Sequence, residues 1–100
     1  MNELLLTRLL DLYGSKSDTG AGLYGKISKL SNLGILKGIY NGGSSFTPTL
    51  SSGMISIYRV AQNSTISGSG YWIFDMFGNY QYVESSMTIP KGIYFFLAGN

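Results

Sequence analysis

Charge is nearly absent from the larger part of this chain. Residues 38–100 hold only four formally charged side chains, Arg59, Asp75, Glu84 and Lys91, yet they hold twelve of the fourteen aromatic residues. A soluble domain of that size normally surrounds itself with charge. A surface built from Ser, Thr, Asn, Gly and Tyr therefore indicates contact with partners rather than free diffusion.

Length sets a second limit. The chain has 100 residues, enough for one domain, or for a helical appendage joined to a β domain of about sixty residues. A β domain that small buries only about 60% of the surface that its unfolded chain exposes, so neighbouring subunits could supply the missing burial. The formal charge of +2 includes no basic stripe suited to a phosphate backbone, so no nucleic-acid partner is expected.

Cysteine and histidine are both absent, which excludes a disulfide framework and thiolate metal ligation. We expect no metal and no cofactor. Glu3 stands where a secretory signal would be basic, and Arg8 and Asp11 interrupt the leucine run before it could span a bilayer. The expectation is an unprocessed, soluble chain made in a cytoplasm, with no membrane partner.

The first helix is expected over residues 3–13. Asn2 can cap it, and Gly14 supplies a left-handed stop. A helical wheel places six apolar side chains on one broad arc, here called the leucine arc: Leu5, Leu6, Leu9, Leu10, Leu12 and Tyr13. Glu3, Thr7, Arg8 and Asp11 occupy the other side. An apolar arc this wide, on a helix too short to be stable alone, must dock on another surface.

A second helix is expected from Ser17 or Asp18 to about Leu33, ending at Gly34. Leu23, Ile27 and Leu30 follow the 4,3 spacing of a coiled-coil seam. Two arrangements stay open from the sequence. The two helices can form a hairpin within one subunit, or several subunits can gather their helices around an axis.

From Ile35 onward, helical spacing gives way to alternation and turn chemistry. The expected strands are Ile35–Tyr40, Met54–Ala61, Tyr71–Phe77, Tyr80–Glu84, Ser86–Ile89 and Ile93–Leu97. This spacing predicts an α+β chain: short N-terminal helices followed by a small antiparallel β-sandwich or barrel of jelly-roll type. Residues 1–34 are expected to be a helical anchor and oligomerisation segment, and residues 35–100 the β domain.

A hairpin is expected around Gly78-Asn79, where Gly stands first in a two-residue type II′ turn. Pairing Phe77 with Tyr80 sorts the two faces of the hairpin. One face, expected to be core, carries Trp72, Phe74, Met76 and Val83. The opposite face carries the candidate partner or glycan surface: Tyr71, Phe77, Tyr80 and Tyr82. Strand Ile93–Leu97 is apolar on both faces, so it is expected to be central or to lie in a subunit contact.

No enzymatic site is expected. Gly20 to Gly25 matches G-x-G-x-x-G, but no strand precedes it, so a hinge between helices is the preferred interpretation. Asp75 and Glu84 share a face on neighbouring strands in the register above, which makes an acid/base pair conceivable. A β domain this small has little room for a substrate cleft. We therefore interpret both carboxylates as charges that keep a tyrosine-rich face hydrated.

A leucine-rich helical start, a Gly/Ser hinge and a low-charge β domain rich in Gly, Ser, Thr and Tyr together resemble the small accessory virion proteins of tailed bacteriophages. These are head fibres, capsid decoration proteins and tail-fibre adaptors. The resemblance implies a homo-oligomer, expected to be a trimer, in which residues 3–33 anchor to the particle and the β tip projects. Its partners would be other capsid or tail proteins. The lack of a repeat or shaft favours a compact decoration or head-fibre unit.

The resemblance implies a non-enzymatic structural protein of the virion, made in the host cytoplasm. A second hypothesis is a small carbohydrate-binding module acting in host-surface recognition. It would stack sugar rings on Tyr71, Tyr80 and Tyr82, since aromatic faces offer large contact area at little entropic cost.

Overall fold

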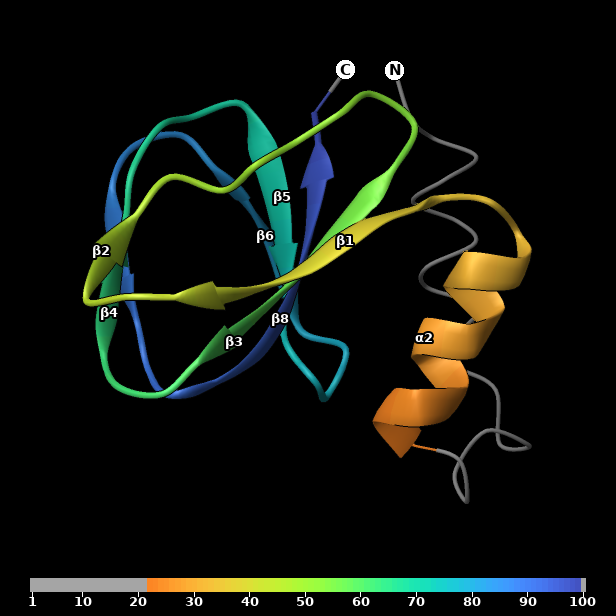
Figure 1. Ribbon diagram of the computed structural model, residues 1–100. Coiled ribbons are helices and arrows are strands. Elements are labelled where there is room, and N and C mark those ends of the chain that lie inside the picture. Colours follow the sequence, from red (N-terminus) through yellow and green to blue (C-terminus); the bar gives the residue numbers. More distant parts are fainter. Residues whose placement is uncertain (1–21, 100) are drawn as a thin grey trace.

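The computed structural model describes residues 22–99. They form one helix and eight strands, in agreement with the expected β-rich α+β class (Figure 1). The elements are α2 (Gly22–Asn32), β1 (Leu36–Gly42), β2 (Ser45–Phe46), β3 (Ile55–Val60), β4 (Ser64–Ile66), β5 (Tyr71–Phe74), β6 (Tyr80–Val83), β7 (Met87–Ile89) and β8 (Gly92–Ala98). The helix expected over residues 3–13 lies outside the described residues.

The strands form two sheets. One has five strands in the order β1-β3-β8-β5-β6, and the other has three in the order β2-β4-β7. In Figure 1 the three-stranded sheet lies on the far side of the molecule from α2. Strand β8 is the middle strand of the larger sheet and is buried along most of its length, which confirms the expected central position of residues 93–97.

The expected antiparallel architecture is wrong for two strand pairs. Strands β1 and β3 are parallel, and so are β2 and β4, whereas the other four pairings are antiparallel. A parallel pair needs a crossover of about a dozen residues, which residues 43–54 supply while also carrying β2. The Gly and Ser residues of this segment predict a turn. They do not reveal that the chain crosses back, so that β3 runs in the same direction as β1.

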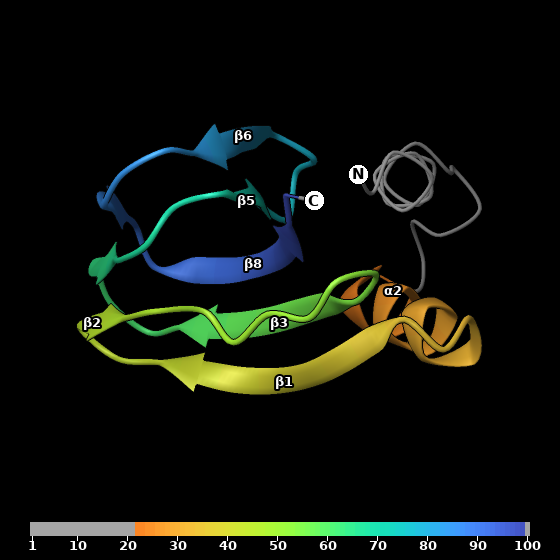
Figure 2. The same cartoon turned by 90° about the horizontal axis from the view of Figure 1, so that it is seen from above.

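The core has two parts, one on each face of the five-stranded sheet. The inner cluster joins the two sheets and contains Phe96, Ile66 and Ile89, none more than 3% exposed. The outer cluster places Leu30 of α2 against Ile55, Ile57, Phe74, Phe95 and Leu97. Figure 2 shows α2 at one end of strands β1 and β3. The helix is therefore part of the same packed body as the strands.

Helix α2 ends as expected at Gly34, which has a φ of 74°. The N–H of Gly34 donates to the carbonyl of Ser31, and the N–H of Ile35 donates to the carbonyl of Leu30. These two bonds form a Schellman motif, and the contact of Ile35 with the Leu30 cluster is the apolar contact that accompanies it. The motif fixes the angle at which the chain leaves α2 and enters β1.

The hairpin of β5 and β6 forms, but its expected register is wrong. Phe74 pairs with Tyr80 and Trp72 pairs with Tyr82, so the loop covers residues 75–79 instead of two residues. The odd shift of three positions exchanges the faces of the two strands relative to each other, since side chains alternate with a period of two.

Within the described residues, no helix is long and apolar enough to span a membrane.

Candidate contact surface on strands β5 and β6

Two rows of paired side chains cross the outer face of the five-stranded sheet. One row contains Ile55, Leu97, Trp72 and Tyr82; the other contains Ile57, Phe95, Phe74 and Tyr80. Each row also crosses β1, through Leu36 or Ile39, and Ile39 is 43% exposed. From β3, where Ile55 and Ile57 are fully buried, burial decreases toward β6, where Tyr82 is 42% and Tyr80 48% exposed.

The exposed end of these rows is a cluster of rings, here called the aromatic edge: Trp72, Tyr80 and Tyr82. The Trp72 ring lies 5.1 Å from Tyr82 in an edge-to-face arrangement and 5.9 Å from Tyr80. Tyr80 also stacks on Phe74 below it, with centroids 5.0 Å apart. The indole nitrogen Nε1 of Trp72 is buried, and it has no hydrogen-bond partner among the described residues. Neither β5 nor β6 contains a charged residue.

The loop between β5 and β6 is organised by the carboxylate of Asp75. Its Oδ1 accepts hydrogen bonds from the backbone N–H groups of Phe77 (2.8 Å) and Asn79 (2.9 Å). Its Oδ2 accepts a third from Nδ2 of Asn79 (2.9 Å). The loop holds the Phe77 ring 89% exposed, the largest value among the large apolar side chains of the described residues. Phe77 is thus an apolar ring presented on a loop of fixed shape.

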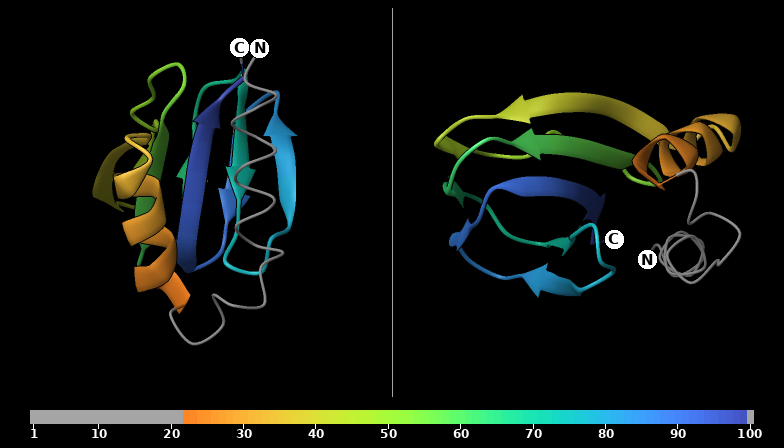
Figure 3. Two further views of the ribbon diagram at one scale, coloured as in Figure 1. Left: turned by 90° about the vertical axis from the view of Figure 1, so that its right-hand side faces the viewer. Right: turned by 90° about the horizontal axis from the view of Figure 1, so that it is seen from below.

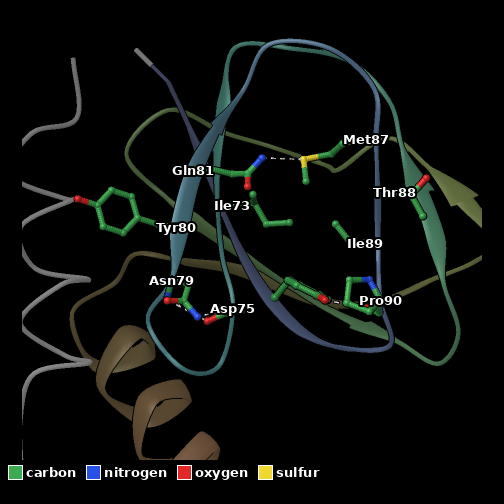
Figure 4. Close-up of a pocket in the computed structure, with 10 residues that line it drawn as sticks. Ile73, Asp75, Asn79, Tyr80, Gln81, Met87, Thr88, Ile89 and Pro90 are labelled. Atoms are coloured by element: carbon green, nitrogen blue, oxygen red, sulfur yellow. Dashed lines mark hydrogen bonds between the residues drawn. The ribbon is translucent and has the colours of Figure 1, made fainter.

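A pocket of about 210 Å³ opens beside this loop, between the two sheets (Figure 4). Ile73 and Ile89 form its apolar wall, while Asp75 and Asn79 lie at one end and Gln81 at the other. Gln81 is held there by a contact of its Nε2 with the sulfur of Met87 (3.2 Å). The pocket is smaller than most small-molecule sites, which usually enclose about 300 Å³ or more. The Asp75 carboxylate at its end already accepts three hydrogen bonds within the loop.

The partner or glycan surface stays a prediction, and the structure shows how exposed its four residues are. Phe77, Tyr80 and Tyr82 are exposed, but Tyr71 is not: it is 2% exposed in the inner cluster. Its hydroxyl donates to the carbonyl of Ser67 (2.7 Å). Trp72, expected in the core, is partly buried against the outer cluster, and its ring also lies beside the two tyrosines. Tyr71 and Trp72 lie on opposite faces because side chains alternate along β5. A prediction with a five-residue loop in place of the two-residue turn would have placed Trp72, and not Tyr71, on the face of Tyr80 and Tyr82.

The predicted anchor residues fall into three groups. The leucine arc lies outside the described residues. Leu23 lies on α2. Ile27 and Leu30 pack against the outer cluster of their own chain, and Leu30 is only 2% exposed. This part of the expected seam therefore meets its own β domain.

The carboxylates are separated in the structure. Asp75 lies in the loop, and Glu84 follows β6 with an exposed side chain, so the acid/base geometry expected from the two-residue turn is lost. Within residues 22–99, no three carboxylates gather where they could hold a metal ion.

Burial raises the pKa of the Tyr71 hydroxyl above its ordinary value of 10.0. Burial also raises the pKa of Tyr94, and the charge of Asp75 adds to that rise. Both phenols are therefore neutral hydrogen-bond donors near pH 7, and neither is activated as a base or nucleophile.

No protein-family model, no curated protein and no solved structure matches this chain.

Proposed function

We propose that the protein is a non-enzymatic structural component of a bacteriophage particle, of the capsid-decoration or head-fibre type. It self-associates, as a homotrimer, and contacts other capsid or tail proteins. The observation that supports this proposal best is Phe77, a ring that is 89% exposed on a loop held by three hydrogen bonds to Asp75.

An exposed ring on a hydrogen-bonded loop is suited to protein contact. Aromatic side chains are enriched at protein interfaces, where they bury a large area. Binding costs less when the contacting loop already has its bound shape, because less conformational freedom is lost. The Asp75 hydrogen bonds provide that shape before any partner arrives. Phe77 therefore has the properties of an interface anchor.

Strand β6, one of the two edge strands of the larger sheet, supports the same proposal. Strand β6 has β5 as its only neighbour in the described sheet, and its sequence, Tyr-Gln-Tyr-Val, contains no charge and no proline. Natural edge strands usually carry charged residues or proline, which prevent pairing with another chain. An unprotected edge is consistent with a chain that functions next to copies of itself.

The test compares Phe77→Ala with Leu33→Ala, which shortens another exposed apolar side chain (47% exposed), directly after α2. Light scattering should give a trimer for the wild-type chain and for Leu33→Ala, and a smaller mass for Phe77→Ala with an unchanged circular dichroism spectrum. A wild-type chain that is monomeric at micromolar concentration would contradict self-association.

Attachment to the particle is assigned to the leucine arc. Deleting residues 1–14 should leave a folded β domain that no longer joins its particle, measured as loss of the protein from purified virions. Unchanged incorporation of the shortened chain would contradict this assignment.

Carbohydrate binding is the second candidate, and the placement of Trp72 favours it. Trp72 shares a face with Tyr80 and Tyr82, so a partly buried ring and two exposed rings lie together where a sugar could stack. Glycan-array binding by a monomeric chain, abolished by Tyr80→Ala and by Tyr82→Ala, would favour this function over the structural one. Equal binding by the wild-type chain and both variants would exclude the aromatic edge as a sugar site.

A further inference from the structure

We propose that the pocket between strands β6 and β7 binds an arginine side chain, which a partner protein inserts beside Phe77. The inference deepens the proposed contact at Phe77, and it rests on the proposed function for one point, that the partner is a protein. Three properties of the described residues support it: the place and size of the pocket, the hydrogen-bond acceptors on its wall, and the charge of Asp75.

The pocket lies at the margin of the fold, where a side chain can enter from outside. Strands β6 and β7 are edge strands of their two sheets, and both contribute residues to the lining. Figure 3 shows β6 at the edge of the larger sheet that lies away from α2. A volume of about 210 Å³ holds about seven groups of the size of a water molecule, at about 30 Å³ each. An arginine side chain, with about seven carbon and nitrogen atoms beyond Cα, therefore fits the pocket.

The polar groups on the wall mainly offer acceptors. Nδ2 of Asn79 donates to Asp75, and Nε2 of Gln81 contacts a methionine sulfur on β7. The hydroxyl of Tyr94 donates to the carbonyl of Pro90. This leaves the side-chain carbonyls of Asn79 and Gln81 and the oxygen of Tyr94 as acceptors, and the other lining hydroxyls can accept as well as donate. A guanidinium group has several N–H donors and no acceptor, so it complements this wall.

Asp75 is the only charged residue among the described residues that line the pocket. Its carboxylate accepts three hydrogen bonds, all from neutral groups, of about four that a carboxylate can accept. Oδ2 accepts only one of the three, so a further donor can approach it. Burial, and after it the charge of Asp75, raises the pKa of Tyr94, another residue of the lining. The negative charge thus extends into the pocket and favours a cation over a neutral donor.

The apolar part of the lining favours arginine over lysine. Ile73 and Ile89 are buried, and their side chains form a wall against which the methylene stem of a basic residue can pack. The ring of Tyr80 also lines the pocket and is 48% exposed. A guanidinium group stacks on aromatic faces and is more weakly hydrated than an ammonium group, so it loses less on leaving water.

The test uses two probes that differ in charge and hardly in shape, N-acetyl-arginine amide and N-acetyl-citrulline amide. Citrulline has a neutral urea group in place of the guanidinium. In amide NMR spectra of the full chain at constant salt, the arginine probe should cause saturable shifts at Ile73, Gln81 and Ile89, with an affinity several-fold above that of the citrulline probe. Equal affinity for both probes, shifts that do not saturate, or shifts confined to other residues would overturn the proposal.

The two carboxylates of the β strands and loops give a matched pair of variants. Asp75→Asn should abolish the preference for the arginine probe. Glu84→Gln removes an exposed carboxylate that does not line the pocket, and it should keep the preference. The same response in both variants would contradict the role of Asp75.

A second pair of variants leaves the hydrogen bonds of Asp75 intact, in case Asp75→Asn does not fold. Gln81 is exposed at the rim of the pocket. Gln81→Lys adds a competing cation and should weaken binding of the arginine probe several-fold, whereas Gln81→Glu should strengthen it. Equal affinity in these two variants would overturn the proposal.

Failure of this inference can be distinguished from failure of the proposed function. Light scattering reports on self-association, whereas the probe titration reports on the pocket alone. A trimer that does not bind the arginine probe would overturn the arginine pocket and leave the structural function standing. A monomer that binds the probe with the expected preference would support the pocket and contradict self-association.

Discussion

Two buried tyrosine hydroxyls couple the described part of the fold to pH. Tyr71 donates to Ser67, and Tyr94 donates to the carbonyl of Pro90 (2.6 Å). The pKa of each is raised above its ordinary value of 10.0, mainly by burial. The unfolded chain therefore releases these protons at a lower pH than the folded chain does. Their contribution to stability is fully present below about pH 10 and is lost as the pH rises through the raised pKa values.

We expect the contribution of these two hydroxyls to the free energy of unfolding to stay constant from neutral pH to about pH 10 and to fall above it. Tyr71→Phe removes one hydroxyl and should lower the free energy of unfolding at pH 7 by about 1 kcal/mol, the usual value of one such hydrogen bond. It should also make the alkaline decrease shallower. Urea titrations from pH 7 to 11 measure both effects. Tyr82→Phe, which alters an exposed ring, is the control at pH 7, and an equal loss there would contradict the role given to Tyr71.

At the scale of elements, the β5–β6 loop depends on one side chain. Asp75→Ala removes the acceptor for three hydrogen bonds and should lower the free energy of unfolding by about 1–2 kcal/mol, because the loop is exposed and water replaces part of the loss. Asp75→Asn keeps one carbonyl acceptor and should lose less. Urea unfolding measures the difference. If the two variants are equally destabilised, the backbone hydrogen bonds to Oδ1 do not hold the loop.

The same loop explains which elements the sequence could predict. Alternation located β5 and β6, but Gly78-Asn79 indicated a two-residue turn, because the competing bonds of Asp75 to the backbone have no signature in the strand pattern. The wrong loop length then placed Tyr71, and not Trp72, on the same face as Tyr80 and Tyr82. Strands β2 and β4, of two and three residues, were not predicted, whereas β7, also of three residues, lies within the expected strand Ser86–Ile89; runs this short give little periodic signal. Gly34 and the central β8 were predicted, since a left-handed stop and a fully apolar strand are local signals.

At the scale of the whole molecule, Leu30 decides whether α2 and the strands unfold together. It is 2% exposed and packs with Phe74 and Phe95 in the outer cluster, whereas Leu33, three residues later, is 47% exposed. The division into an anchor of residues 1–34 and a β domain of residues 35–100 stays a prediction. The packing of Leu30 allows this division to be tested, because loss of the Leu30 contact should destabilise the strands as well as the helix.

Leu30→Ala should therefore lower the free energy of unfolding by about 3 kcal/mol, the usual cost of emptying a buried leucine site. Leu33→Ala should change it by less than about 0.5 kcal/mol, because that side chain keeps most of its contact with water. Helix loss by circular dichroism and exposure of Trp72 by fluorescence should follow one transition with the same midpoint in urea. Two separate midpoints would mean that α2 melts before the sheet and that the chain folds as two units divided near residue 34.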